Sequence, residues 1–216
     1  MNELIQTITV YALPVIFAIT VHEAAHGYVA RMFGDPTAYQ AGRVTLNPIP
    51  HIDLVGTILV PLGMLLLSKL AGGAGMLFGW AKPVPVDWGR LRHPKRDMLW
   101  VALAGPMSNL IMAIIWAISL RLLYQSEGIS GFWGQMALAG ISVNLVLMAI
   151  NLFPLPPLDG GRIVFSLLPS RAAWQYAKLE PYGMMIIILL LVTGVLWPLL
   201  RPIMAVGTMI VRLFLP

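Results

Sequence analysis

Long apolar stretches alternate with short polar breaks along this chain. The longer stretches approach the roughly 20 residues that a helix needs to cross the hydrocarbon of a bilayer. Because a soluble core of this size cannot bury so much apolar sequence, the pattern predicts several membrane-spanning helices. The stretches cover residues 4–33, 98–124, 135–153, 182–200 and 202–215.

Three segments between these stretches depart from the helical pattern. Residues 38–46 alternate loosely between apolar and polar positions, and residues 82–87 carry two prolines, which confine a strand to a sheet edge. We expect both to form short β elements. Residues 52–80 are apolar but broken by Gly and Pro, so we expect a re-entrant hairpin or an uneven pair of helices there. The predicted fold class is an all-α membrane protein, a polytopic helix bundle of about five to six membrane segments.

The composition agrees with a membrane location. Hydrophobic residues make up 58% of the 216 residues and charged residues only 11%, whereas soluble domains carry about 25% charged residues. The absence of cysteine excludes disulfides, a thiolate zinc site and a cysteine nucleophile. We expect one integral membrane domain over residues 1–216, with a core at about 4–168 and C-terminal helices at 182–215.

The formal net charge of +5 comes mostly from Lys and Arg in the breaks between apolar stretches. A basic loop such as residues 90–96 could contact nucleic acid, but cytoplasmic loops of membrane proteins are rich in Lys and Arg, which explains the charge more simply. We therefore expect no nucleic-acid partner. The same rule places the N-terminus outside and the loop around Asp159 at the cytoplasmic side.

The first apolar stretch contains the motif His22-Glu23-Ala24-Ala25-His26. Positions i and i+4 lie on one face of a helix, so both imidazoles can bind one metal ion while the glutamate acts on bound water. The alternatives are a proton relay, ion transport or polar packing between helices. Ionisable groups clustered in an apolar span are costly, however, and this cost favours a catalytic metal site.

A catalytic zinc needs a third protein ligand and an open position for water. Without cysteine, the candidates are His51, His93 and a carboxylate. Asp159 is the most suggestive carboxylate, because the sequence LDGG at 158–161 follows a membrane stretch and a proline-rich break, where non-helical backbone must line a cavity. The alternative is that Asp159 caps the helix that follows it.

Several motifs within residues 22–161 occur together in one known family. Their combination resembles the site-2 protease family of intramembrane zinc metalloproteases. The motif that begins at Gly42 is typical of the compact bacterial and archaeal branch, and the chain shows neither the PDZ domain nor the nucleotide-binding domain of other members. The motifs are His22-Glu23-x-x-His26, Gly42-Arg43-x-x-Leu46-Asn47-Pro48-x-x-His51-x-Asp53, Ala104-Gly105-Pro106-x-x-Asn109 and Asn151-x-x-Pro154-x-Pro156-x-Leu158-Asp159-Gly160.

The resemblance implies a ligand set, a base and a cofactor. His22, His26 and Asp159 would hold one Zn²⁺ per chain, which lowers the pKa of its water towards about 7. Glu23 would take the proton as the water attacks the scissile carbonyl and would pass it to the leaving amine. The implied activity is hydrolysis of peptide bonds in or near transmembrane segments of membrane proteins.

The same resemblance implies roles for two further residues and for the β elements. Asn151 would help to hold the substrate backbone, and either Asn151 or His51 could donate to the developing oxyanion. His51 could instead cap backbone groups of its own turn. Segments 38–46 and 82–87 resemble the family's membrane-dipping β elements, whose edges would pair with an unwound substrate segment.

The resemblance also implies the setting of the enzyme. We expect a multi-pass protein of a bacterial or archaeal cell membrane, with the lipid bilayer and a transmembrane protein or peptide substrate as partners and the active site towards the cytoplasmic side. A zinc transporter or binding scaffold is the main alternative, but it needs a hydrophilic path that the apolar stretches do not offer. A member that binds without cutting is disfavoured because Glu23 is intact. The oligomeric state stays open.

Overall fold

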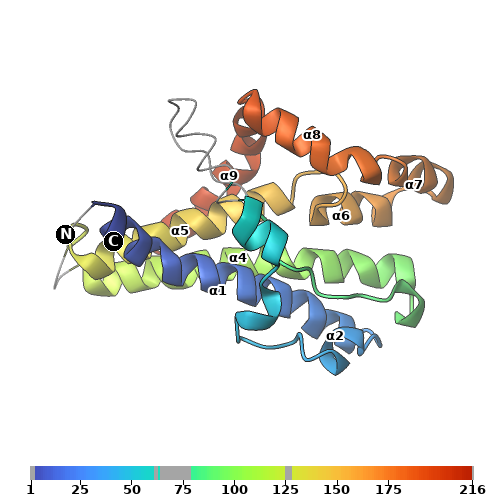
Figure 1. Ribbon diagram of the computed structural model, residues 1–216, viewed down its shortest axis with the longest axis horizontal. Helices are drawn as coiled ribbons and strands as arrows, with labels where there is room; N and C mark the ends of the chain where they lie inside the picture. The colour runs from blue at the N-terminus through green and yellow to red at the C-terminus, as the bar shows by residue number, and fades with distance from the viewer. Residues whose placement is uncertain (1–2, 61–62, 64–78, 125–127, 216) are drawn as a thin grey trace.

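The computed structural model describes residues 3–60, 63, 79–124 and 128–215. Three long helices form the body of the molecule; several shorter helices lie towards one end of it, and the last helix packs along it against two of the long helices (Figure 1). The long helices are α1 (Glu3–Met32), α4 (Pro94–Leu123) and α5 (Phe132–Asn151). The short elements before α4 are α2 (Thr37–Gln40), η1 (Ile49–His51), η2 (Leu54–Leu59) and η3 (Trp88–Arg90). The elements after α5 are α6 (Asp159–Leu167), α7 (Ser170–Ala177), α8 (Glu180–Val192) and α9 (Leu196–Arg212).

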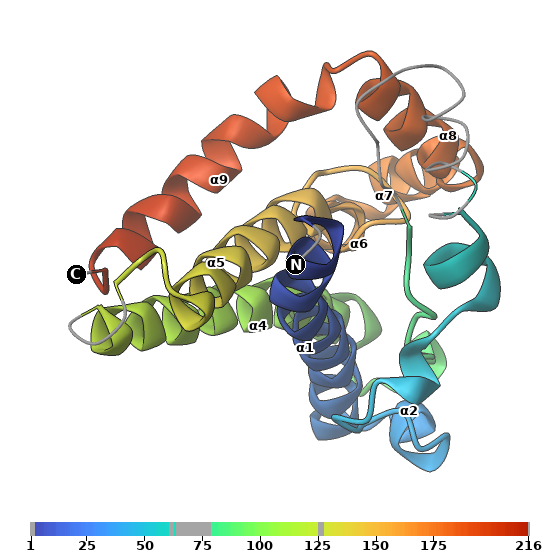
Figure 2. The same cartoon turned by 60° about the vertical axis from the view of Figure 1, so that its left-hand side comes forward.

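Small residues let the long helices approach closely. Helix α4 packs against both α1 and α5 (Figures 1 and 2). Ala113 and Ala117 of α4 are fully buried in a cluster with Leu145 and Met148 of α5, and a Cβ at Gly140 would run into the Trp116 indole. Helix interfaces in membranes are enriched in small residues for this reason.

The helical membrane fold is confirmed at the level of class. Within the described residues, α1, α4 and α5 are long and apolar enough to cross a bilayer, and a fourth span results if the pair α7 and α8, bent by 61°, is counted as one. The predicted five to six segments are not reached in this part of the chain. The prediction of one continuous helix over residues 182–200 is also wrong, since a turn with a positive φ at Gly194 separates α8 from α9.

The predicted β elements are wrong, because no strand forms among the residues that the structure describes. Residues 38–46 fold as α2 followed by turns, and residues 82–87 are extended without a partner strand. Proline removes an N–H from the ladder at two of these positions. The Lys82 and Asp87 amides donate instead to the His51 carbonyl (2.9 Å) and to Asp35 Oδ2 (2.7 Å).

The two ends of segment 52–80 lie side by side, as a hairpin that returns to its starting side requires. The Trp80 amide donates to the Gly56 carbonyl at 3.1 Å, and Thr57 Oγ1 donates to the Trp80 carbonyl at 2.9 Å. A Cβ at Gly56 would run into the Trp80 indole, so this close approach requires glycine. Most of the segment between these ends, residues 61–62 and 64–78, lies outside the described residues.

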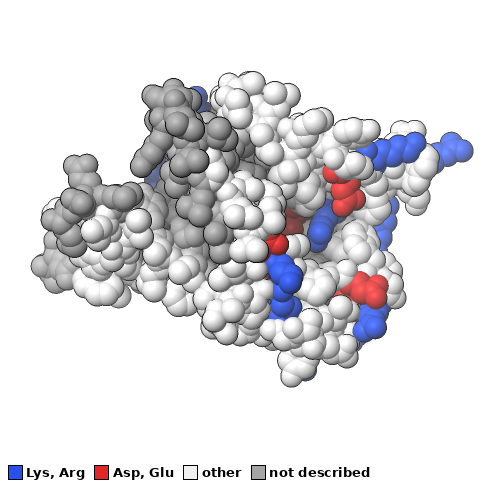
Figure 3. All heavy atoms as spheres, viewed as in Figure 1, with Lys and Arg blue, Asp and Glu red and all other residues white. Residues whose placement is uncertain are grey.

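Charged side chains gather towards one end of the molecule. On the face shown in Figure 3, they lie mostly over the end that carries α2, α6 and α7. Helix α6 packs against α4 at this end, which brings the start of α6 towards the last three turns of α1. The fold therefore assembles α1, α4 and α6 around one point near the polar end of the bundle.

Candidate metal centre

Three buried side chains from two helices converge at this point. His22 and His26 lie one turn apart on α1, with ring centroids 4.7 Å apart, and Asp159 is the first residue of α6. The two Nε2 atoms are 3.1 Å apart, and each lies 3.2 Å from Asp159 Oδ2. The exposed fraction of each residue is 7% or less, so the three potential ligand atoms form a small triangle shielded from solvent.

The other ring nitrogen of each histidine fixes how the ring is oriented. His22 Nδ1 donates to Asn109 Oδ1 at 2.7 Å, and His26 Nδ1 donates to the Val101 carbonyl at 2.7 Å. Asn109 Oδ1 is the acceptor because its Nδ2 already donates to the Ala18 carbonyl and to Asn144 Oδ1. With the Nδ1 positions protonated, both neutral rings direct a bare Nε2 lone pair at the carboxylate.

This arrangement fits a zinc ion. Zinc bonds of about 2.0–2.1 Å in tetrahedral geometry place ligand atoms about 3.3 Å apart, close to the observed edges of 3.1–3.2 Å. Asp159 Oδ2 is buried and accepts no hydrogen bond from the described residues. Three electron-rich atoms that face one another without protons repel unless a cation lies between them. Three protein ligands would also leave one tetrahedral position for water or substrate.

The carboxyl group of Asp159 is held in its charged form. Burial alone raises the pKa of Asp159, but positive charge beside it, carried by His26 and His22 when they are protonated, outweighs burial and holds the pKa below its usual range. Its alternative role as a helix cap is not observed, since the N-cap of α6 is Leu158 and no side chain caps the helix. The carboxylate is thus free to act as a ligand.

Glycines make room for the triangle on two sides. A Cβ at Gly105 of α4 would run into the imidazoles of both His22 and His26. Cβ atoms at Gly160 and Gly161 would run into the backbone of residues 152–156, so the glycines let α6 start directly against that loop. Sequence reasoning included Gly105 and Asn109 in a family motif but gave them no role. A polar Asn inside an apolar stretch was the signal that could have indicated one.

Glu23 lies between the two histidines in the α1 sequence and is partly exposed. Its Oε2 accepts a hydrogen bond from the Val84 amide, with the nitrogen 2.8 Å away. Val84 belongs to the extended segment 82–87, so a carboxylate on the membrane helix is held from outside the bundle. Sequence reasoning did not predict this contact.

The contacts of the other two predicted site residues lie elsewhere. Asn151 Nδ2 donates to the Leu147 carbonyl of its own helix at 3.0 Å. His51 is 2% exposed, and its Nε2 donates to the Thr45 carbonyl at 3.3 Å. Its Nδ1 is buried without a partner among the described residues. Neither residue contributes to the triangle of ligand atoms, and their roles stay predictions.

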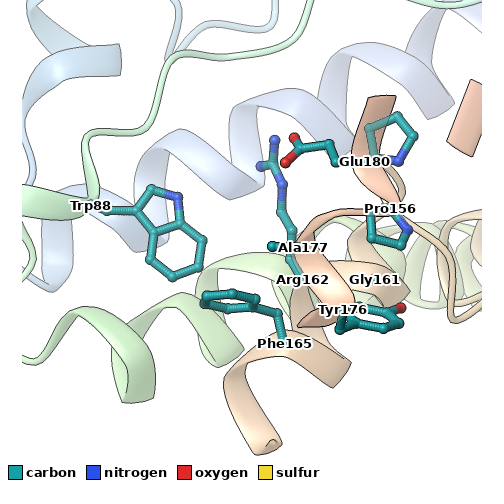
Figure 4. Close-up of a pocket in the computed structure, with 9 residues that line it drawn as sticks. Trp88, Pro156, Gly161, Arg162, Phe165, Tyr176, Ala177 and Glu180 are labelled. Atoms are coloured by element: carbon teal, nitrogen blue, oxygen red, sulfur yellow. The ribbon is translucent and has the colours of Figure 1, made fainter. Parts of the chain in front are cut away.

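A pocket of about 280 Å³ borders the helix that carries Asp159. Trp88 and Phe165 meet edge to face in its wall, with centroids 5.4 Å apart. Figure 4 shows Arg162 and Glu180 extending on the same side of the pocket. Because Gly161 and Arg162 line it, the pocket begins within a few residues of the ligand triangle.

Comparison with known proteins agrees with this geometry. The model of peptidase family M50 matches residues 124–194. A Bacillus subtilis protein, YwhC, described as a candidate zinc metalloprotease, is 42% identical over 198 residues, which are 88% of this chain and 84% of YwhC. The chain belongs to peptidase family M50. Further relatives, also described as candidate zinc metalloproteases, are Rip2 of Mycolicibacterium smegmatis, 28% identical over 84% of this chain and 66% of Rip2, and MJ0611 of Methanocaldococcus jannaschii, 28% identical over 66% of this chain and 62% of MJ0611.

Membership of family M50 confirms the resemblance to site-2 proteases. The chain is a zinc metallopeptidase whose cofactor is Zn²⁺, and its apolar helices make it an integral membrane protein. No solved structure matches this chain.

Proposed function

We propose that this M50 peptidase hydrolyses peptide bonds in or near the transmembrane segments of membrane proteins. In this proposal His22, His26 and Asp159 hold one Zn²⁺, and Glu23 is the general base. The observation that carries the proposal is the buried triangle of potential ligand atoms. Two of them lie on a helix long enough to cross a bilayer, with a carboxylate fixed between the two histidines in sequence.

Each side chain has a separate task. A bound zinc ion supplies Lewis acidity towards water and towards the scissile carbonyl. Glu23 accepts the proton of the attacking water and delivers it to the leaving amide nitrogen. Asn109 and the Val101 carbonyl hold the two imidazoles so that their Nε2 atoms keep facing Asp159. Charged groups that are buried and oriented before substrate arrives need little reorganisation during the reaction.

The substrate must present an unwound segment, because a helix keeps its amides and carbonyls bonded within itself. We assign Asn151, at the end of α5, as the residue that holds the substrate backbone, and His51 as the second candidate oxyanion donor. The pocket of Trp88 and Phe165 is suited to an apolar or aromatic substrate side chain, because apolar walls with a few polar groups are typical of binding pockets.

We also propose a multi-pass protein of a bacterial or archaeal cell membrane, with its active site towards the cytoplasm. The relatives come from bacteria and an archaeon. On the face shown in Figure 3 the charged side chains lie mostly over the end that carries α2, α6 and α7, and α6 begins with Asp159. Lys and Arg concentrate on the cytoplasmic side of membrane proteins.

The test compares purified wild-type protein with the variant Glu23→Gln. Wild type is expected to hold one zinc per chain and to cut a model transmembrane substrate, whereas Glu23→Gln keeps the zinc and loses about 10²- to 10⁴-fold in rate. If both proteins bind zinc and neither cuts any of a panel of membrane substrates, the proposal fails. Zinc flux in vesicles would then identify a transporter.

A further inference from the structure

Arg43 is a buried cation whose partners are backbone carbonyls. The residue is 9% exposed. Its Nη2 donates to the Lys82 carbonyl at 2.9 Å and lies 3.4 Å from the Pro83 carbonyl. No carboxylate of the described residues forms an ion pair with it, and its Nε is buried without a partner. Burying a guanidinium without a counter-charge is costly, so the position needs a reason beyond packing.

The two carbonyls belong to the stretch that holds Glu23. Pro83 and Pro85 have no N–H, so the Val84 amide stands alone between them, and it donates to Glu23 Oε2 at 2.8 Å. Arg43 therefore contacts the carbonyl of the 82–83 peptide group and the carbonyl of the 83–84 peptide group, whose N–H donates to Glu23. The path from the guanidinium to the carboxylate runs through two peptide units.

The same stretch is seated on α1 close to the ligands. Val84 is 6% exposed, and a Cβ at Gly27 would lie 3.1 Å from Val84 Cγ1 and 2.8 Å from Val44 Cγ2. Gly27 follows His26 directly and lies one turn after Glu23. On the other side, Gly42 has a φ of +66°, a turn conformation that favours glycine and from which Arg43 reaches the carbonyls.

We propose that Arg43 is a positioning residue for Glu23 and acts through the backbone of Lys82, Pro83 and Val84. The inference rests on the proposed role of Glu23 as general base. A partly exposed glutamate on a helix can adopt several rotamers, and the Val84 amide selects one of them. The Val84 amide already donates to Glu23 and the Lys82 amide to the His51 carbonyl, so these two amides are not free to pair with a substrate strand.

The experiment uses Arg43→Gln and Arg43→Lys in full-length protein, with Arg90→Gln as matched control. Arg90 forms an exposed ion pair with Asp87 at the far end of the same segment. Arg43→Gln is expected to lower kcat by about 10- to 100-fold, the effect of a misplaced catalytic group, with KM changed less than about threefold and one zinc still bound. Arg43→Lys, which keeps the positive charge but offers only one donor nitrogen, falls between wild type and Arg43→Gln. Arg90→Gln keeps the wild-type kcat.

Hydrogen exchange of the peptide that spans residues 80–88 gives a readout independent of activity. Arg43→Gln and Glu23→Gln should both speed exchange there by more than Arg90→Gln does. A wild-type kcat for Arg43→Gln, a raised KM at constant kcat, or unchanged exchange overturns the proposal. If wild type does not cut, or Glu23→Gln still cuts, the proposed function fails instead, and the exchange result still decides whether Arg43 holds this segment.

Discussion

The two halves of the candidate site are held by different parts of the molecule. The ligand triangle is fixed by packed helices, since the partners of His22 and His26 are Asn109 and Val101 of α4. Glu23 is fixed by the Val84 amide of an extended segment outside the bundle. The proposed metal ligands thus belong to the helical core, whereas the position of the proposed base depends on the extended segment. The difference implies that changes in the loop should affect catalysis and spare the metal.

Two buried asparagine side chains, Asn109 and Asn144, add to the constraints on the ligand triangle. Asn144 of α5 accepts from Asn109 and donates to its own Gly140 carbonyl, and both asparagines are fully buried. Three helices therefore contribute to the orientation of one imidazole. The glutamate has one hydrogen bond from one backbone amide, so it is the part of the site with fewer constraints.

The largest expected effect comes from removing a ligand. Asp159→Ala should lower zinc affinity by more than about 100-fold and reduce peptidase activity to background, because two imidazoles alone leave the site incomplete. Zinc titration and cleavage of a membrane substrate measure both effects. Glu23→Gln is the control that should lose activity alone. Tight zinc binding by Asp159→Ala would show that a different residue completes the site.

Replacing either of two glycines with alanine tests whether the ligand triangle and Glu23 can be disturbed separately. Gly105→Ala places a methyl group against both imidazoles and should weaken zinc binding by about 10- to 100-fold, as other displaced ligands do. Gly27→Ala places the same group against Val84 and Val44 and should lower kcat by about tenfold while zinc stays bound. Equal zinc loss in both variants would contradict the division into two halves.

Asn109→Ala removes the acceptor of His22 Nδ1 and should weaken zinc binding by about 10- to 100-fold. The effect should be at the lower end, because a water molecule can replace the lost carbonyl oxygen. Ser108→Ala is the control, since Ser108 Oγ donates only to the Gly105 carbonyl within α4. Zinc dialysis against a competing chelator compares the three proteins. Equal zinc affinities for Asn109→Ala and Ser108→Ala would show that the Asn109 side chain does not contribute to zinc binding.

The parts that sequence reasoning predicted are those with local signals. The spacing of His22 and His26 on a helix and the LDGG sequence around Asp159 are read from neighbouring residues, and the structure brings the three side chains together. Long apolar stretches predicted α1, α4 and α5 for the same reason, because the hydrophobic thickness of a bilayer sets their length.

The parts that sequence reasoning missed depend on contacts between distant residues. Glu23 and Val84 are 61 positions apart, and no periodicity links them. The expected strand at 82–87 failed because the amides of Lys82, Val84 and Asp87 donate to the His51 carbonyl and to two side chains instead of to a neighbouring strand. The helix break at Gly194 needed knowledge of its φ, which an apolar run does not reveal.

The smallest expected effect concerns Asp35, which holds the Asp87 end of segment 82–87, and it depends on pH. Asp35 is fully buried; its Oδ1 accepts from the Thr37 amide and hydroxyl, and its Oδ2 accepts from the Asp87 amide. Burial alone raises the pKa of Asp35, but these donors and the charge of Arg90 outweigh it and lower the pKa below its usual value. The folded state therefore prefers the ionised carboxyl. Its stabilisation is complete above the unfolded pKa of about 3.9 and is lost as the pH falls through the lower folded value.

Asp35→Asn should accordingly lower the free energy of unfolding by about 1–2 kcal/mol at pH 7, the typical range for hydrogen bonds to a charged group. The deficit should shrink as the pH drops below about 4. Thermal unfolding of both proteins between pH 3 and pH 7 measures it, and zinc content at pH 7 should be the same in both. A deficit that stays constant over this range would mean that Asp35 acts through its shape and not its charge. Loss of zinc in Asp35→Asn would mean that Asp35 also supports the ligand triangle, which would contradict the separation between the two regions.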